Sequence, residues 1–597
     1  MGKFFEKWKK EADFPIVLFA RLVLFFMWGA QLINSDAYYV NYLLIIVVSS
    51  ICLYINYRSI FLHREIEIKK IDRYIIVIFS LMFSCMITLA NYRIWNGLLF
   101  FDDFGLSFKF LYSSFIFLII IVGGYIAFSN IFIVAYKSIK RMQWKHTLNI
   151  FFHPSVVFLV SFILIVLTRL LVLFLCQYPG ELTTDSIGQI NQIMTGVYSN
   201  HHPFFHTIII KCFIDIGLFL FDDINAAVAL YFIFQIFITA ISFSYAVSTM
   251  VWMKVPRWMV VLSILFFLFM PYHIIYAITM WKDILFACCI LLFITSFYRC
   301  MTYIGNAILS YLILVASGFG ICLLRSNGLF VFFIIGITFT LFWKSQKKKT
   351  LLFMLILFIS FILKHNVLHA LGVTQPDTIE SLAIPSQQVA RVVYDGAKLE
   401  NWERDALNEI IDVDQIAENY YYYSVDHIKL LVREKGNQNL LVQNKVKYIK
   451  LYFSLGVKYP MSYLKGWIDE TRGYWNSGYD FWCWQCGIEN NEWGIQRKTN
   501  STTLNTLFRE YLWIFLNTQC LRIFMSIGLL VWLDLIMFMI SLFRRDKIGA
   551  FVSIPILAIT VSLLLATPVF AEFRYLYAGF CAMPLLIVIV LRPMGSK

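Results

Sequence analysis

Long apolar runs recur along this chain from residue 15 to residue 591, and they most constrain how it can fold. A helix that spans a bilayer needs about 20 consecutive apolar residues. Lipid offers no partners for backbone polar groups, so runs of this length predict helices. We predict about fourteen spans, over residues 15–33, 39–57, 74–91, 110–136, 155–176, 225–251, 257–276, 283–303, 307–324, 328–343, 350–371, 520–543, 549–567 and 575–591.

The composition fits an all-α polytopic membrane protein. Of the 597 residues, 60% are hydrophobic and 14% are charged, whereas soluble domains carry about 25% charged residues. The mean hydropathy is +0.72. The formal net charge of +14 indicates basic cytoplasmic loops rather than nucleic-acid binding, because Lys and Arg accumulate on the cytoplasmic side of membrane proteins.

The basic loops predict the orientation of the chain. With a cytoplasmic N-terminus, all of them fall on the inner side: Arg58–Arg73, Lys137–Lys145, Lys254–Arg257, Lys344–Lys349 and Arg544–Lys547. The polar interval Tyr178–Thr207 then falls outside. We therefore expect a multi-pass protein of the cell membrane, with both termini in the cytoplasm and its functional site on the extracellular face.

The alternation of apolar and polar sequence divides the chain into four parts. Residues 1–150 are predicted to form an N-terminal transmembrane region of four helices. Residues 151–371 form a transmembrane core whose first external loop is 177–222. Residues 372–518 are the only large hydrophilic block, and we expect an external, mostly helical soluble domain there. Residues 519–597 form a C-terminal transmembrane region of three helices.

One apolar segment of the first external loop is predicted to lie along the membrane rather than across it. Pro203–Phe221 carries Thr207, Lys211 and Asp215 at four-residue spacing. This spacing places the polar groups on one helical face, which is typical of a helix in the membrane interface. If the segment spanned the membrane, every later basic loop would lie outside.

The same loop gathers most of the residue types that carry chemistry. Asp185 follows the turn Tyr178–Gly180, where a carboxylate could deprotonate an acceptor hydroxyl. With Glu181 or a histidine it could also hold a divalent cation such as Mg or Mn. The plainer alternative for Asp185 is a helix cap or a solvated loop acid. Further candidates in the loop are Gln189, Asn200, His201, His202 and His206.

The histidine pair leaves two interpretations open. His201 and His202 could bind a phosphate or a sugar hydroxyl, or ligate a metal. They could equally be polar anchors at the membrane interface. Pro203 favours a helix with proline at its first position, which would make His202 a cap residue.

Three charged patches are predicted at outer helix ends, on the same membrane face as Asp185. The first pairs Lys282 with Asp283, the second is Arg325, and the third is Glu572 with Arg574 and Tyr575. Each has a structural alternative, either a snorkelling lysine or an ion pair within the protein. Their shared face favours a site for an anionic lipid, because Lys and Arg bind phosphate.

Two cysteines differ from the others, which lie in or beside apolar runs. Cys483 and Cys486 form a CxxC in a polar region that is expected outside the membrane. A disulfide is favoured over redox or zinc chemistry, because no second CxxC or histidine pair lies nearby. No P-loop is present either, so nothing indicates a nucleotide-driven pump.

The order and sidedness of these pieces resemble the GT-C class of glycosyltransferases, which includes protein O-mannosyltransferases, aminoarabinose transferases and oligosaccharyltransferases. The resemblance covers residues 155–371 and rests on YPGELTTDS (178–186) and SNHHPFFHT (199–207), and more loosely on MWKD (280–283) and EFRYLY (572–577). A single Asp-Ser stands where the mannosyltransferases have Asp-Glu.

The resemblance implies a polyprenyl-phosphate sugar donor used on the outer face. It makes Asp185 the catalytic acid of the first loop, with Glu181 and His202 as further candidates from the loop itself. Contacts to the lipid phosphate would come from Lys282, Arg325, Arg574 and Tyr575. Substrate contacts are expected from Gln189, Asn200, His201, His206, Asp283 and Glu572.

The function predicted from the sequence is transfer of a sugar to an external acceptor, such as a cell-wall glycopolymer or a lipid. The expected partners are the polyprenyl-phosphate donor, the glycan acceptor and membrane lipids, with no nucleic acid. The alternative is a transporter or flippase for a lipid-linked saccharide, which would need charges along a path through the membrane. A non-catalytic scaffold for envelope assembly is the third interpretation.

Overall fold

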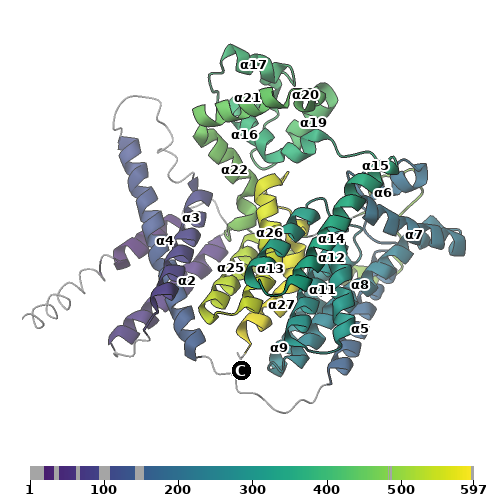
Figure 1. Ribbon diagram of the computed structural model, residues 1–597, viewed down its shortest axis with the longest axis horizontal. Helices are drawn as coiled ribbons and strands as arrows, with labels where there is room; N and C mark the ends of the chain where they lie inside the picture. The colour runs from purple at the N-terminus through teal and green to yellow at the C-terminus, as the bar shows by residue number, and fades with distance from the viewer. Residues whose placement is uncertain are drawn as a thin grey trace, which may run out of the picture.

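The protein is a bundle of apolar helices beneath a smaller helical domain (Figure 1). The computed structural model describes residues 19, 21–32, 39–61, 67–92, 108–141, 153–479, 481, 483 and 487–592. Within these residues, β pairing is limited to isolated bridges. Ten described helices are long and apolar enough to cross a membrane, or up to eleven if one bent pair is a single span. The prediction of an all-α polytopic membrane protein is confirmed.

Fewer described helices pass this test than the fourteen spans predicted. Two predicted spans fold as apolar helices that are shorter than this test requires: Ala307–Leu323 and Gly328–Phe342. Another, predicted over 520–543, is interrupted by Ser526, and its long helix begins only at Ile527. The side chain of Ser526 accepts a hydrogen bond from the Leu529 N–H and so caps the new helix.

The N-terminal helices pack against the C-terminal ones. They are α2 (Tyr39–Phe61), α3 (Lys70–Ala90) and α4 (Phe108–Arg141). Trp532 of α25 (Ile527–Arg544) meets Phe83 and Phe128, with ring centroids 4.8 and 5.5 Å apart. These buried rings join the first and last parts of the chain in one apolar cluster.

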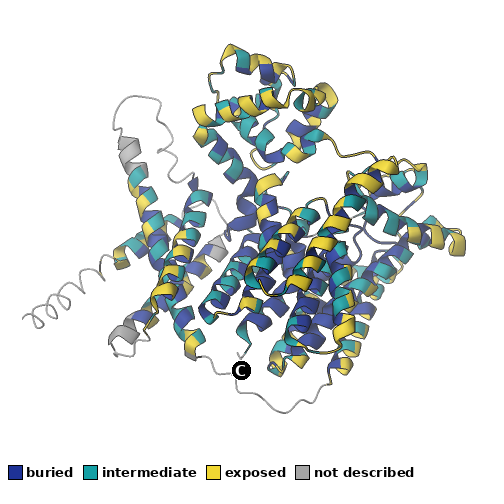
Figure 2. Ribbon diagram, viewed as in Figure 1, coloured by how far each residue is buried: buried dark blue, intermediate teal, exposed yellow. Residues whose placement is uncertain are grey.

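The central bundle surrounds α11. Its helices are α5 (Pro154–Leu171), α8 (Ile224–Trp252), α9 (Arg257–Phe269), α10 (Pro271–Ala277), α11 (Lys282–Thr302), α12 (Ala307–Leu323), α13 (Gly328–Phe342), α14 (Lys347–Ile362), α26 (Lys547–Ala566) and α27 (Tyr577–Leu591). In the most apolar window of α11, 83% of the residues are buried, against 28% in the peripheral α14. Figure 2 shows the same gradient from a buried centre to exposed outer helices. Because α27 packs on α11, the C-terminal helices complete the wall of the core.

A kink between α9 and α10 was not predicted. The span expected over 257–276 bends by 52° at Pro271, because proline cannot continue the helical hydrogen bonds. The carbonyls of Phe267 and Leu268 are left free and accept hydrogen bonds from the fully buried guanidinium of Arg169. A cation at membrane depth is thereby paired with backbone oxygens.

Two short helices link α5 to α8. They are α6 (Thr184–Thr195) and α7 (Phe204–Phe221). α7 lies near the end of the bundle where α6 is found and projects to one side (Figure 1). Its length and apolar composition would also allow a span, so its interfacial position stays a prediction.

The helical domain holds two small apolar cores. Its elements are η4 (Thr378–Leu382), α16 (Ala383–Tyr394), α17 (Asn401–Asn408), α18 (Val413–Glu418), α19 (Asp426–Lys435), α20 (Asn439–Gln443) and α21 (Lys445–Lys458). One core lies around α18 and α19, and the other around α17 and α21. The long α22 (Pro460–Trp475) leads from this domain to the bundle (Figure 1).

The remaining described helices are short pieces or connections. They are η2 (Val172–Cys176), η3 (Leu363–Val367), α15 (Leu368–Ala370), α23 (Thr502–Asn517), α24 (Gln519–Arg522), η5 (Ile523–Met525) and η6 (Phe573–Leu576).

Gly180→Ala is expected to destabilise the fold more than Gly196→Ala. Both glycines have a positive φ, of 133° and 71°, so both substitutions strain the backbone. A Cβ at Gly180 would lie only 2.2 Å from the Phe232 ring, whereas a Cβ at Gly196 meets nothing within 4 Å. The difference should be about 1–3 kcal/mol. Thermal unfolding of the detergent-purified variants measures it, and equal midpoints would contradict the steric argument.

Candidate active site

Asp185 is placed by the start of α6. Thr183 and Ser186 cap this helix reciprocally, with the Ser186 hydroxyl accepting from the Thr183 N–H at 3.1 Å. Asp185 lies in the first turn, where the helix dipole favours an anion. The cap therefore fixes where the carboxylate points.

Two cations meet at one oxygen of this carboxylate. Arg574 donates to Oδ2 of Asp185 at 2.8 Å, and Lys282 donates to the same oxygen at 3.4 Å. Asp185 is 29% exposed at its side chain, while Lys282 and Arg574 are each 16% exposed. One carboxylate oxygen is thus shared by two cations in a partly buried place.

The charge balance decides the ionisation of Asp185. Burial by itself would raise the pKa of this carboxyl. Lys282 and Arg574 oppose burial and outweigh it, so the pKa lies well below its usual range. Asp185 is therefore an anion at any physiological pH.

His202 lies against the same lysine. Burial lowers the pKa of His202 to about 3, and the charge of Lys282 adds to this effect. The imidazole is therefore neutral. Because a lysine ammonium can only donate, Nδ1 of His202 accepts its hydrogen bond at 3.2 Å, so the proton lies on Nε2.

A second ion pair lies beside the first. Nε of Arg325 is 3.1 Å from Oδ1 of Asp283, whose side chain is fully buried. Arg325 also donates to the Tyr575 carbonyl at 2.9 Å. Asp283 follows Lys282 at the start of α11, and Tyr575 follows Arg574, so the two ion pairs share their supporting elements.

Aromatic rings support both guanidinium groups. The Arg574 guanidinium lies over Trp281 and Tyr575, at 4.8 and 5.3 Å from the ring centroids. The Arg325 guanidinium also lies over the Tyr575 ring, at 4.8 Å from its centroid. Tyr575 is therefore a platform for two arginines, and such stacking holds arginine in a fixed direction.

The turn that carries Arg325 is tightly packed. Lys364 donates to the Arg325 carbonyl at 2.7 Å. A Cβ at Gly328 would lie 1.9 Å from the Ile321 carbonyl oxygen, so only glycine allows α12 and α13 to approach this closely. The short turn holds the backbone of Arg325 at the end of the bundle.

Glu181 has a different set of contacts from Asp185. Its carboxylate is 2.8 Å from Arg497 and accepts from the Gly487 N–H at 2.7 Å. It is 2% exposed. Burial raises its pKa to about 7, against the opposing charge of Arg497. The structure thus uses Glu181 to tie the first loop to the segment near Gly487.

Gln189 and His206 join a buried hydrogen-bond network. Oε1 of Gln189 lies 3.0 Å from Nδ1 of His206, and Nε2 of His206 lies 2.9 Å from the Tyr231 hydroxyl. Both side chains are buried. They were predicted as substrate contacts, but in this structure their polar atoms connect α6 and α7 to α8.

The other predicted contacts have separate positions. The Asn200 side chain accepts from the Phe204 N–H at 3.2 Å and so caps α7. This differs from the prediction for His202, because Pro203 is the cap position and α7 begins at Phe204. Glu572 lies 3.9 Å from Arg574, and burial raises its pKa.

The residues around Asp185 do not fit the divalent cation predicted there. The carboxylate already faces two cations, and no group of three or more His, Cys, Asp or Glu in the described part of the chain could hold a metal. Cys483 is buried. Cys486 lies outside the described residues, so the disulfide stays a prediction.

Comparison with known proteins identifies the family of this chain, but the description of that family names no activity. A family of unknown function, DUF6020, matches residues 192–595. The chain belongs to this family. The match includes His202, Lys282, Arg325 and Arg574 and begins after Asp185. No curated protein and no solved structure matches the chain.

Sequence reasoning gave no role in the site to three residues that hold the candidate site together. Nε1 of Trp281 donates to the Thr183 hydroxyl at 2.8 Å and its ring supports Arg574. Arg497 binds Glu181, and Lys364 braces Arg325. The sequence did contain a signal for Trp281, because this residue directly precedes Lys282 in the motif MWKD (280–283). Arg497 gave no signal, since 316 positions separate it from Glu181 along the chain (497 − 181).

Glu181→Gln is expected to reduce the pH dependence of stability. The pKa of Glu181 rises from 4.5 to about 7 on folding, so between these values the folded protein binds more protons than the unfolded chain. The free energy of unfolding therefore falls as the pH rises through this window, by about 3 kcal/mol for this group.

Thermal unfolding in detergent at pH 5 and pH 8 tests this dependence. The wild type should lose more stability between the two values than Glu181→Gln does. Glu510→Gln, which changes an exposed carboxyl of α23, is the matched control and should behave as the wild type. An equal loss in wild type and Glu181→Gln would contradict the assignment.

Proposed function

We propose that this protein is a glycosyltransferase that moves a sugar from a polyprenyl-phosphate donor to an acceptor hydroxyl. The observation that carries the proposal is the sharing of one Asp185 oxygen by Lys282 and Arg574, at 3.4 and 2.8 Å. An acid and two cations lie side by side at one end of a helix bundle. General-base transfer from a phosphate leaving group needs both elements.

The cations suit a phosphate that arrives from lipid. Lys282 and Arg574 would turn from the shared carboxylate to the incoming phosphate, which offers several acceptor oxygens. The N-terminus of α11 begins at Lys282, so the positive end of its dipole adds to the attraction. Arg325, stacked on Tyr575 beside Arg574, extends the positive surface.

Donor binding would also activate Asp185. Its pKa lies below the usual range because Lys282 and Arg574 stabilise the anion. An anion with so low a pKa is a weak base. When the phosphate takes these cations as partners, the carboxylate loses its stabilisation and becomes more basic. The site would therefore have its base ready only when the donor is present.

The proposed step is a single displacement at the anomeric carbon. Asp185 takes the proton of the acceptor hydroxyl while the acceptor oxygen forms the new bond to that carbon. The bond from the carbon to the phosphate oxygen breaks, and polyprenyl phosphate leaves with the electron pair. Lys282, Arg325 and Arg574 stabilise this leaving group. Attack from the opposite side would invert the configuration.

The setting of the reaction follows from the distribution of charge. The basic loops favour a topology with both termini in the cytoplasm and the site on the extracellular face. The acceptor would then be an external glycan, such as a cell-wall glycopolymer, or a lipid. A GT-C-like fold with about fourteen spans is part of the same proposal.

Asp185→Asn is expected to lower the rate of transfer about 10²- to 10⁴-fold, because the amide cannot take the proton. The measurement is sugar transfer by the full-length protein in lipid vesicles, with a panel of radiolabelled polyprenyl-phosphate sugars. Asp215→Asn is the matched control. Asp215 lies on exposed α7 and pairs only with Lys211 among the described residues, so this variant should transfer at the wild-type rate.

The outcomes of this assay separate the alternatives. If wild type and Asp185→Asn transfer sugar equally well, Asp185 is not the catalytic base, but the protein is still a glycosyltransferase. If the labelled lipid crosses the bilayer and its sugar is not transferred, the protein is a flippase rather than a transferase.

Lys282→Gln is expected to raise KM for the donor about 10- to 100-fold, because a charged hydrogen bond to phosphate is lost. Lys211→Gln, which removes an exposed lysine of α7, should leave KM unchanged. Donor titrations with both variants measure the effect. A change in kcat alone would place Lys282 away from donor binding.

A further inference from the structure

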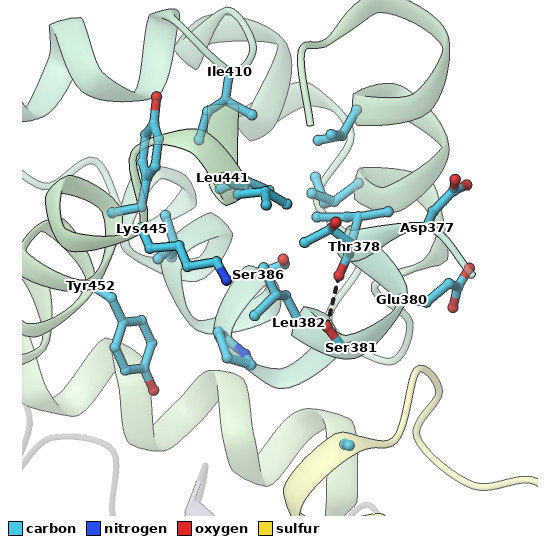
Figure 3. Close-up of a pocket in the computed structure, with 18 of the residues that line it drawn as sticks. Asp377, Thr378, Glu380, Ser381, Leu382, Ser386, Ile410, Leu441, Lys445 and Tyr452 are labelled. Carbon is cyan, nitrogen blue, oxygen red and sulfur yellow. Dashed lines mark hydrogen bonds between the residues drawn. The ribbon is translucent and has the colours of Figure 1, made fainter. Parts of the chain in front are cut away.

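A large cavity lies in the helical domain, and Asp185 is not among the residues that line it. It encloses about 1260 Å³, which exceeds the roughly 300–1,000 Å³ of ordinary small-molecule sites. Its walls come from η4, α16, α19, α20 and α21 (Figure 3). The two apolar cores of the domain lie around it, so the cavity separates them.

The lining indicates an apolar chain rather than a sugar. By area most of the wall is apolar, and its aliphatic residues include Ile410, Ile416, Ile428, Val432 and Leu441. A site for a glycan would need many hydrogen-bond partners, because buried hydroxyls without partners are costly. A hydrocarbon chain has no such requirement and gains free energy from burial.

The cavity reaches the end of the membrane bundle. Its lining includes Ser326 and Asn327, in the turn between α12 and α13, and Ala566 at the end of α26. His201 also contributes, and it precedes the His202 that contacts Lys282. A chain could therefore pass from the level of the helix ends into the domain.

The edge of the cavity is unusually apolar for a domain surface. Ile449 and Phe453 of α21 line the cavity and are 56% and 63% exposed. Val446 and Val457 continue the same face of the helix at 82% and 81% exposed. Such a stripe beside a cavity is typical of a surface that meets lipid.

One cation points into the cavity without a carboxylate partner. Figure 3 shows the Lys445 ammonium directed toward Ser386, with the carboxylates of Asp377 and Glu380 on the other side. Asp377 pairs with Arg433 at 3.0 Å, and Glu380 pairs with Lys429 at 2.9 Å. Within the part of the chain that the structure describes, Lys445 forms no ion pair. This exposed ammonium is therefore available to pair with an anionic ligand.

We propose that this cavity binds an acyl chain of an anionic membrane lipid, with the headgroup charge against Lys445. The aliphatic walls, the opening at the helix ends, the apolar edge of α21 and the unpaired ammonium all match an anionic amphiphile. The proposal concerns binding, and it stands whether or not Asp185 catalyses sugar transfer.

The test uses the full-length protein in detergent and palmitic acid that carries a photoreactive diazirine. After illumination, mass spectrometry of the peptides locates the label. We expect labelling of peptides from η4, α16 and α21. Ser386→Trp should lower it, because the indole occupies the part of the cavity that Ser386 faces (Figure 3). Lys445→Glu should lower labelling about two- to fivefold, because this is the loss of affinity expected when one exposed ion pair is removed.

Matched variants keep the result interpretable. Lys450→Glu changes the same residue type on the same helix, outside the cavity lining, and should leave labelling unchanged. Lys445→Glu alters an exposed residue, so it tests the proposal even if Ser386→Trp does not fold. Asp185→Asn should label as the wild type, which separates this proposal from the catalytic one.

Three results would overturn the proposal. They are label confined to the membrane helices, equal labelling of wild type and a folded Ser386→Trp, and equal labelling of wild type and Lys445→Glu. Hexadecanol that carries the same diazirine tests the role of the headgroup charge, because it is neutral. It should label the same peptides more weakly than palmitic acid does. Equal labelling by the two probes would show that the charge has no role.

Discussion

The contact of Lys282 and Arg574 with one oxygen of Asp185 is the interaction on which the candidate site depends. It joins the first loop, the start of α11 and the short helix before α27. Charges in a partly buried place are costly unless they are paired. The pairing therefore brings together segments that lie 389 residues apart along the chain and makes the end of the bundle a single structure.

The surroundings of this contact are organised to keep the cations in place. Trp281 donates a hydrogen bond to Thr183 and its ring contacts Arg574, while the Tyr575 ring contacts the guanidinium groups of both Arg325 and Arg574. Aromatic faces support arginine without neutralising it. The positive charge is therefore fixed in direction and remains available to an anion, which is the property that a phosphate-binding site requires.

The sequence singled out three residues that meet in the structure, and it predicted the lengths of the helices less closely. Asp185, Lys282 and Arg574 were singled out because polar residues at apolar helix ends are rare and need partners, and the structure brings them together. Gln189 and His206 gave the same signal, but their side chains bond to one another inside the protein. A polar residue type shows that a partner exists, and it does not show whether the partner is a ligand or another side chain.

What the sequence by itself determined is the class of the protein. The length of its apolar runs requires membrane helices, because lipid leaves backbone groups no other partners. Only the tertiary structure decided which charges meet. The pairing of Glu181 with Arg497, the bonds from Arg169 to the kink at Pro271, and the cavity between the two cores of the helical domain all join distant segments. Such contacts depend on packing in three dimensions, and no local pattern in the chain encodes them.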